Sequence, residues 1–117
     1  MWRDHAYLLD MQLAVADTLG FAAGLDQAGF EASNLHESAI LRKLEIIGEA
    51  AGQVSREFRA EHLEIPWSAR IGLRSRLIHG YRVVQLDVVW RVVCRDLPAL
   101  IDALRPLIPA EDDPGAP

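Results

Sequence analysis

The chain of 117 residues is half apolar and one quarter charged, and its formal net charge is −5. These values fit one globular domain with a hydrophobic core, and they exclude a general nucleic-acid-coating role, which needs a basic domain. The single cysteine, Cys94, excludes an internal disulfide, and no apolar run approaches the roughly 18 residues of a membrane span. We therefore expect a cytoplasmic protein that does not contact a membrane.

Helical spacing of apolar residues runs through the whole chain, so we predict an all-α fold. A first helix is expected over residues 3–25. Its apolar stripe consists of Leu8, Leu9, Leu13, Val15, Ala16 and Leu19. A second helix is expected from Asn34 to about residue 61 or 62, because Asn34 and Glu37 have the form of a capping box.

A seam of apolar residues continues along this second helix at spacings of three and four, as in a coiled coil. Its members are Ile40, Leu44, Ile47, Ala51 and Val54. Gly48 and Gly52 lie four residues apart on the same helix. We expect these glycines to let another backbone approach closely.

The second half of the chain is expected to hold shorter helices. Pro66 suits the first turn of a helix over residues 66–79, and Gly80 is well placed to end it. Asp87 is expected to cap a fourth helix, which Pro98 should kink or split. Residues 1–108 then form one domain. The acidic, proline-rich residues 109–117 are predicted to be a disordered tail.

Four or five helices joined by short loops make a helical bundle. The fourth helix is apolar around nearly its whole circumference, from Val88 to Val93. A helix of this kind must be buried on several sides. In so small a protein, a second copy of the chain could supply one of those sides.

The positive charge gathers in one window of the sequence. Between Glu64 and Asp87 there is no acidic residue, but there are Arg70, Arg74, Arg76, His79 and Arg82. The arginines give this window a charge of +4, so the remainder of the chain sums to −9. Arginine pairs with phosphate through a planar fork of donors, and histidine exchanges protons near physiological pH. A phosphate group is therefore the first substrate group to consider.

Arg74 and His79 are the candidate chemical pair. On a continuous helix they would lie about 140° apart around the axis and about 7.5 Å apart along it. His79 would then sit in the last turn, where the helix dipole favours a protonated imidazole, and the Tyr81 hydroxyl could project into the same space. Taken singly, the residues of this window have plainer interpretations: His79 as a capping or surface residue, Arg76 and Arg82 as solvated or salt-bridged, and Tyr81 as a packing residue.

Other chemistries lack their patterns in this sequence. The four histidines show no metal-ligand spacing, and there is no glycine-rich phosphate loop or Gly-x-Ser-x-Gly elbow. Neither a metal nor a cofactor is expected. Glu45 and Glu49 follow Arg42 on one helix face, and they are expected to form surface pairs with it rather than an acid–base couple.

Arg74, His79 and Tyr81 resemble the Arg-x4-6-His-x-Tyr signature of the HEPN superfamily. Further blocks resemble its HepT branch in the same order along the chain. These blocks are residues 44–51, 65–67, 77–81 and 86–90. The resemblance extends from Trp2 to about Leu107. It implies an all-helical, HEPN-like homodimer in which two signatures face each other across a cleft.

The resemblance also implies a function, that of a toxin that cleaves RNA without a metal. Its implied partner is MntA, a minimal nucleotidyltransferase that neutralises the toxin by attaching AMP to the signature tyrosine, here Tyr81. Arg74 and His79 are then the catalytic pair, with Ser75 and Arg76 supporting phosphate binding. One position departs from the family pattern. The residue after the arginine is usually Asn, Asp or His, whereas Ser75 is shorter and cannot carry a charge.

The expected reaction is internal attack of a ribose 2′-OH on the adjacent phosphate. His79 would act as general base or acid, and Arg74 would stabilise charge on the phosphoryl oxygens. A dimer would supply a second His79. Two other interpretations stay open. One is a non-catalytic helical subunit of a nucleotidyltransferase, whose arginine window holds a nucleotide or an acidic face; the other is a purely structural dimer.

Overall fold

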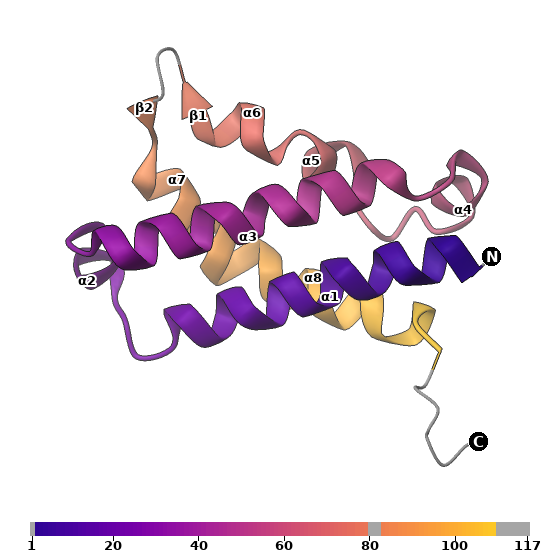
Figure 1. Cartoon of the computed structure of the whole chain (residues 1–117), viewed down its shortest axis with the longest axis horizontal. Coiled ribbons are helices and arrows are strands. Elements are labelled where there is room, and N and C mark those ends of the chain that lie inside the picture. The colour runs from indigo at the N-terminus through magenta and orange to yellow at the C-terminus, as the bar shows by residue number, and fades with distance from the viewer. Residues whose placement is uncertain (1, 80–82, 110–117) are drawn as a thin grey trace.

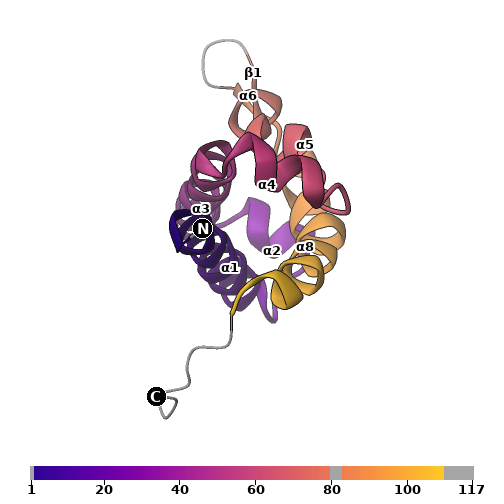
Figure 2. The same ribbon diagram turned by 90° about the vertical axis from the view of Figure 1, so that its right-hand side faces the viewer.

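The structure is a computed structural model that describes residues 2–79 and 83–109. In chain order it contains α1 (Trp2–Ala22), α2 (Gln27–Glu31), α3 (Asn34–Gln53), α4 (Arg56–Glu61), α5 (Trp67–Ile71), α6 (Leu73–Leu77), β1 (Ile78–His79), β2 (Val83–Val84), α7 (Leu86–Arg91), a π-helical turn (Val92–Asp96), α8 (Leu97–Leu104) and a 3-10 turn (Arg105–Leu107). The two long helices, α1 and α3, run side by side (Figure 1, Figure 2). The predicted all-α bundle is confirmed, with one hairpin of two-residue strands added to it.

The core lies between α1, α3 and the C-terminal helices. The seam predicted along the second helix is confirmed, because all five of its residues are buried. The stripe predicted for the first helix is partly wrong, since Leu9 and Leu13 are exposed. The buried face of α1 follows another set at spacings of three and four, which stay on one side of a helix. This set is Asp4, Leu8, Met11, Val15 and Thr18.

The predicted second helix is two helices. α3 ends at Gln53, the next residue is extended, and Ser55 begins α4 by accepting a hydrogen bond from the Phe58 N–H through Oγ. The N-cap of α3 is Ser33 and not Asn34 as predicted, because Ser33 Oγ accepts from the backbone N–H of His36. A serine hydroxyl in each position therefore satisfies helix-end donors that have no partner within the helix.

The predicted helix over residues 66–79 is wrong in its extent. Two short helices, α5 and α6, meet at Gly72, and the chain then enters β1. Glycine is a poor helix former, which explains the break. β1 pairs antiparallel with β2 so that His79 opposes Val83, and β-branched residues such as the two valines of β2 favour strands. Gly80, the predicted end of the helix, lies outside the described residues.

The interruption predicted at Pro98 is confirmed. In the π-helical turn the N–H of Leu97 bonds to the carbonyl of Val92, five residues back. α8 begins at Leu97 with the proline in its first turn. Proline causes this change because it has no N–H for the α-helical ladder and its ring clashes with the preceding turn.

α7 is buried in part by its own chain. It begins after Gln85, and Asp87 lies in its first turn rather than at the predicted cap. Val89 is fully buried, and Trp90 stacks on Phe30 of α2 with ring centroids 5.2 Å apart. Leu86, Val88 and Trp90 are only half-buried, so the expectation that a second copy of the chain covers part of this helix stays a prediction.

Two predictions fall at the limits of the described part of the chain. Residues 110–117, most of the predicted tail, lie outside it, so the tail and the domain boundary at residue 108 stay predictions. Within the described ranges, no helix has the length and apolar character needed to cross a bilayer.

Candidate active site

The position of the candidate site depends on the packing of α5 against α3. A Cβ added to Gly48 would lie 3.0 Å from the main-chain oxygen of Arg70 and 3.4 Å from that of Ile71. The close backbone approach predicted at Gly48 is therefore confirmed. At Gly52 the nearest atom is the side-chain Cγ2 of Ile71 at 4.0 Å, an ordinary contact. The Gly48 contact fixes the position of α5, and α6 follows directly after Gly72.

α6 carries the first half of the signature. Leu73 and Leu77 are buried one helical turn apart and hold the helix against the bundle. Ser75 and Arg76 are exposed. Arg74 belongs to the same helix, and the structure describes its backbone only. α6 lies on the side of α3 that faces away from α1 (Figure 1, Figure 2).

His79 lies on β1 and not in the last turn of a helix. The base of the hairpin is closed by a hydrogen bond from the Gln85 N–H to the Leu77 carbonyl, 3.1 Å long. Arg74 and His79 therefore sit on consecutive elements, α6 and β1, so their helical separation and the helix-dipole argument for His79 do not apply. Tyr81 lies outside the described residues.

Not every arginine of the segment between Glu64 and Asp87 contributes positive charge to the protein surface. Arg70 is only 4% exposed, and its Nη2 lies 3.4 Å from Oδ2 of Asp96 in the π-helical turn. Arg76, in contrast, is exposed to solvent. Sequence reasoning missed the Arg70–Asp96 pair because its members are 26 residues apart and no local pattern links them.

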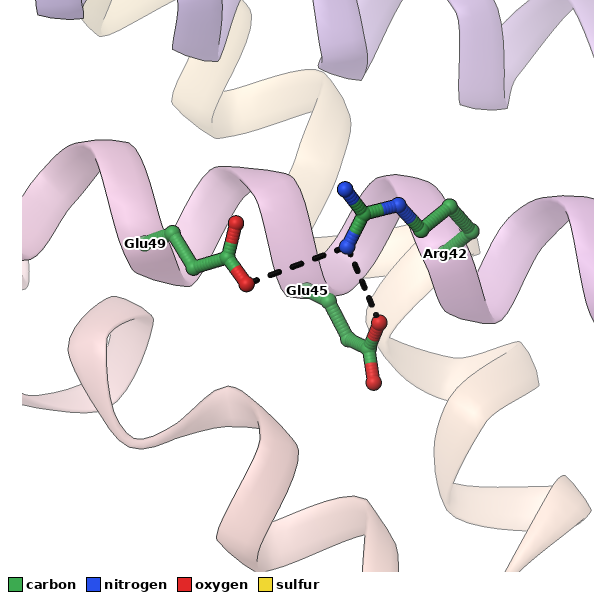
Figure 3. Close-up of polar contacts among 3 residues, drawn as sticks. All are labelled: Arg42, Glu45 and Glu49. Carbon is green, nitrogen blue, oxygen red and sulfur yellow. Dashed lines mark hydrogen bonds and ion pairs between the residues drawn. The ribbon is translucent and has the colours of Figure 1, made fainter.

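Arg42, Glu45 and Glu49 form a charged cluster on α3. Nη1 of Arg42 lies 3.3 Å from Oε1 of Glu45 and 3.8 Å from Oε2 of Glu49 (Figure 3). The predicted surface pairs are confirmed. Exposed pairs of this kind contribute about 0.2–1 kcal/mol. The side chain of Glu45 points away from α1, toward the side of α3 on which α6 lies (Figure 1, Figure 3).

The Asp4 carboxyl has a shifted pKa, but it lies far from the signature. Burial alone would raise the pKa of Asp4, and the hydrogen bonds from the backbone and side chain of Ser55 outweigh that effect and lower it. Asp4 lies in the first turn of α1, at the opposite end of the bundle from the hairpin (Figure 1). Among the described residues, no three His, Cys, Asp or Glu side chains are arranged to hold a metal ion.

Comparison with known proteins adds to this geometry. A family model described as "Ribonuclease HepT-like" matches residues 11–107. "Probable ribonuclease HepT" of Thermococcus cleftensis is 36% identical over 101 residues, which cover 86% of this chain and 92% of the relative. "Putative RNase MJ1380" of Methanocaldococcus jannaschii is 33% identical over 95 residues, which cover 81% of this chain and 87% of the relative. No solved structure matches the chain at a significant level.

The matched region contains α3, the α5–α6 segment and both strands of the hairpin. Arg74 and His79 lie within it, in the order and spacing of the HEPN signature. The family match covers residues 11–107, and the helical bundle of the described residues extends over the same part of the chain. The chain therefore belongs to the HepT-like ribonuclease family of the HEPN superfamily.

Proposed function

We propose that this chain is a metal-independent endoribonuclease that acts as the toxin of a toxin–antitoxin pair. The main support for the proposal is the family match, which covers the segment that contains Arg74 and His79. These two residues belong to the consecutive elements α6 and β1. Ribonuclease activity is also what the names of the two relatives state. The substrate is RNA in the cytoplasm, where the single cysteine of the chain stays reduced.

The reaction forms a bond between the ribose 2′-oxygen and phosphorus and breaks the bond from phosphorus to the 5′-oxygen. His79 of one subunit takes the proton from the 2′-hydroxyl, and His79 of a second subunit gives a proton to the leaving 5′-oxygen. Arg74 stabilises the negative charge that grows on the non-bridging oxygens. Ser75 and Arg76, both exposed on α6, support the phosphate.

The products test this chemistry directly. Because the 2′-oxygen is the nucleophile, cleavage leaves a 2′,3′-cyclic phosphate on one fragment and a 5′-hydroxyl on the other. The purified chain should generate these ends on a labelled RNA in the presence of EDTA. Products with a 5′-phosphate, or activity that EDTA abolishes, would contradict the mechanism.

The proposed antitoxin is an MntA-like minimal nucleotidyltransferase that transfers AMP to Tyr81. The phenol is largely un-ionised at neutral pH, so the partner enzyme must activate it. The phenol oxygen attacks the α-phosphate of ATP, and pyrophosphate leaves. Because Tyr81 follows His79 by two residues, the attached phosphate lies beside the signature and competes with RNA for its arginines.

Co-expression with such a nucleotidyltransferase tests the role of Tyr81. The tryptic peptide that contains Tyr81 should gain one or more AMP masses, and growth should recover. Tyr81→Phe should block both effects and leave RNA cleavage nearly intact. Neutralisation of Tyr81→Phe to the wild-type degree, without any mass change, would show that the partner inhibits by forming a complex instead.

A second candidate function is that of a non-catalytic helical subunit for a nucleotidyltransferase. Ser75 favours it, because the family usually places Asn, Asp or His after the signature arginine. Ser75→Asn separates the two proposals. If the chain is a ribonuclease, this substitution should maintain or raise cleavage; if neither the wild type nor Ser75→Asn cuts RNA, the non-catalytic function is the better account.

A further inference from the structure

Arg70 is buried, and most of its guanidinium group lacks a partner. The residue is 4% exposed, and its contact with Asp96 is 3.4 Å long, beyond the roughly 2.7–2.9 Å of a strong charge-assisted hydrogen bond. Nε and Nη1 are both buried and donate to no atom in the described part of the chain. A guanidinium cannot lose its proton in a protein. The folded chain therefore leaves this buried cation incompletely paired.

Arg70 lines a cavity of ≈ 170 Å³ beside the start of α5, the π-helical turn and α8. Four charged side chains take part in its wall: Glu64, Arg70, Arg95 and Asp96. Their formal charges cancel. Each carboxylate already uses one oxygen, because Asp96 Oδ2 faces Arg70 and Glu64 Oε2 lies 3.4 Å from Nδ1 of His62.

The rest of the cavity wall is apolar. It consists of Pro66, Ala99, Leu100 and Ala103. A cavity of about 150 Å³ with an apolar lining is large enough to bind benzene. The occupant of this cavity must therefore be small, with a short apolar part to cover the alanines of α8.

We propose that this cavity binds a small aliphatic α-amino acid, at a site distinct from the ribonuclease signature. The carboxylate of the ligand pairs with Arg70 and Arg95, and its ammonium group pairs with Glu64 and Asp96. The short side chain packs on the apolar wall. An anion alone would also meet the carboxylates of Glu64 and Asp96, and a cation alone would leave Arg70 incompletely paired. Only a zwitterion matches all four charges.

Isothermal titration calorimetry of the full chain with L-valine tests the proposal. Isovalerate is valine without its ammonium group, and isobutylamine is valine without its carboxylate. We expect saturable binding of valine and affinities at least about tenfold weaker for both analogues. Binding of isovalerate as tight as that of valine, or no binding of valine up to about 10 mM, would overturn the proposal.

Two variants locate the binding in the cavity. Ala103→Leu fills the space without changing any charge, and it should weaken valine binding at least about tenfold. Ala28→Leu, on the exposed side of α2, is the matched control and should bind like wild type. Arg70→Gln should also lose binding; if it fails to fold, Ala103→Leu carries the test. Wild-type affinity in a folded Ala103→Leu protein would refute the site, and neither result depends on ribonuclease activity.

Discussion

The Asp4 carboxylate accepts two hydrogen bonds from Ser55, 2.8 Å from its backbone nitrogen and 2.7 Å from its hydroxyl, across 51 residues of chain. Ser55 in turn caps α4 by accepting from Phe58. The first turn of α1 therefore holds the break between α3 and α4 in place. The helical pattern of the sequence continues through this break, so the boundary depends on a tertiary partner that no local pattern reveals.

Asp4→Asn should destabilise the fold by about 1–3 kcal/mol, because the amide lacks the charge and offers a single acceptor oxygen to the two partly buried donors of Ser55. Urea unfolding at neutral pH would measure the loss. Asp10→Asn, at an exposed position of the same helix, is the control and should stay within about 0.5 kcal/mol of wild type.

The same contact makes a prediction about pH. The folded-state pKa of Asp4 is lowered, so its carboxylate contributes stability above its unfolded-state pKa of about 3.9, and this contribution is lost as the pH falls through the folded-state pKa. The stability difference between wild type and Asp4→Asn should therefore shrink below about pH 4. A difference that is unchanged in acid would show that the contribution of Asp4 does not depend on its charge.

At the scale of elements, the contact between α3 and α5 positions α6, the helix that contains Arg74. Gly48 is the point of contact, and its prediction from the sequence succeeded because glycine is the residue that lets backbones touch. The prediction of one helix over residues 66–79 failed. Leu73 and Leu77 keep helical spacing, but the pairing of His79 with Val83 decides that the chain leaves the helix.

Gly48→Ala should destabilise the protein by about 1–3 kcal/mol, because its Cβ would meet a main-chain oxygen at 3.0 Å and push α5 away. RNA cleavage should fall with it, since α6 moves together with α5. Gly52→Ala is the matched control. Its Cβ meets nothing closer than 4.0 Å, so better helix propensity should stabilise it by up to about 1 kcal/mol. Equal thermal stability of the two variants would contradict this account of the packing.

At the scale of the whole molecule, the sequence motif predicts some residues of the site, and other features of the site depend on the three-dimensional fold. The spacing of Arg74 and His79 was sufficient to nominate both residues. The burial of Arg70 against Asp96 was not predictable, because in the sequence Arg70 looks like one more cation of the same window. The fold thus buries Arg70, whereas Arg74, four residues further on, belongs to α6.

The proposed homodimer can be tested by its geometry. If two signatures face each other, the interface lies on the α6 side of α3. Ile71, which is 38% exposed, belongs to the α5–α6 segment on that side, whereas Leu13, which is 54% exposed, belongs to α1 on the other side (Figure 2). Light scattering at micromolar concentration should show a wild-type dimer, a monomer for Ile71→Asp and a dimer for Leu13→Asp. A monomeric wild type, or dissociation by Leu13→Asp alone, would contradict the arrangement.

The most direct test of the central claim is the rate of RNA cleavage in EDTA by wild type, Arg74→Ala, His79→Ala and the exposed control Arg56→Ala. The first two variants should each lose about a hundredfold or more, because each removes a group that acts on the transition state. Circular dichroism should show unchanged helicity, and Arg56→Ala should cut RNA like wild type. Full activity in His79→Ala would contradict the assignment of the catalytic pair.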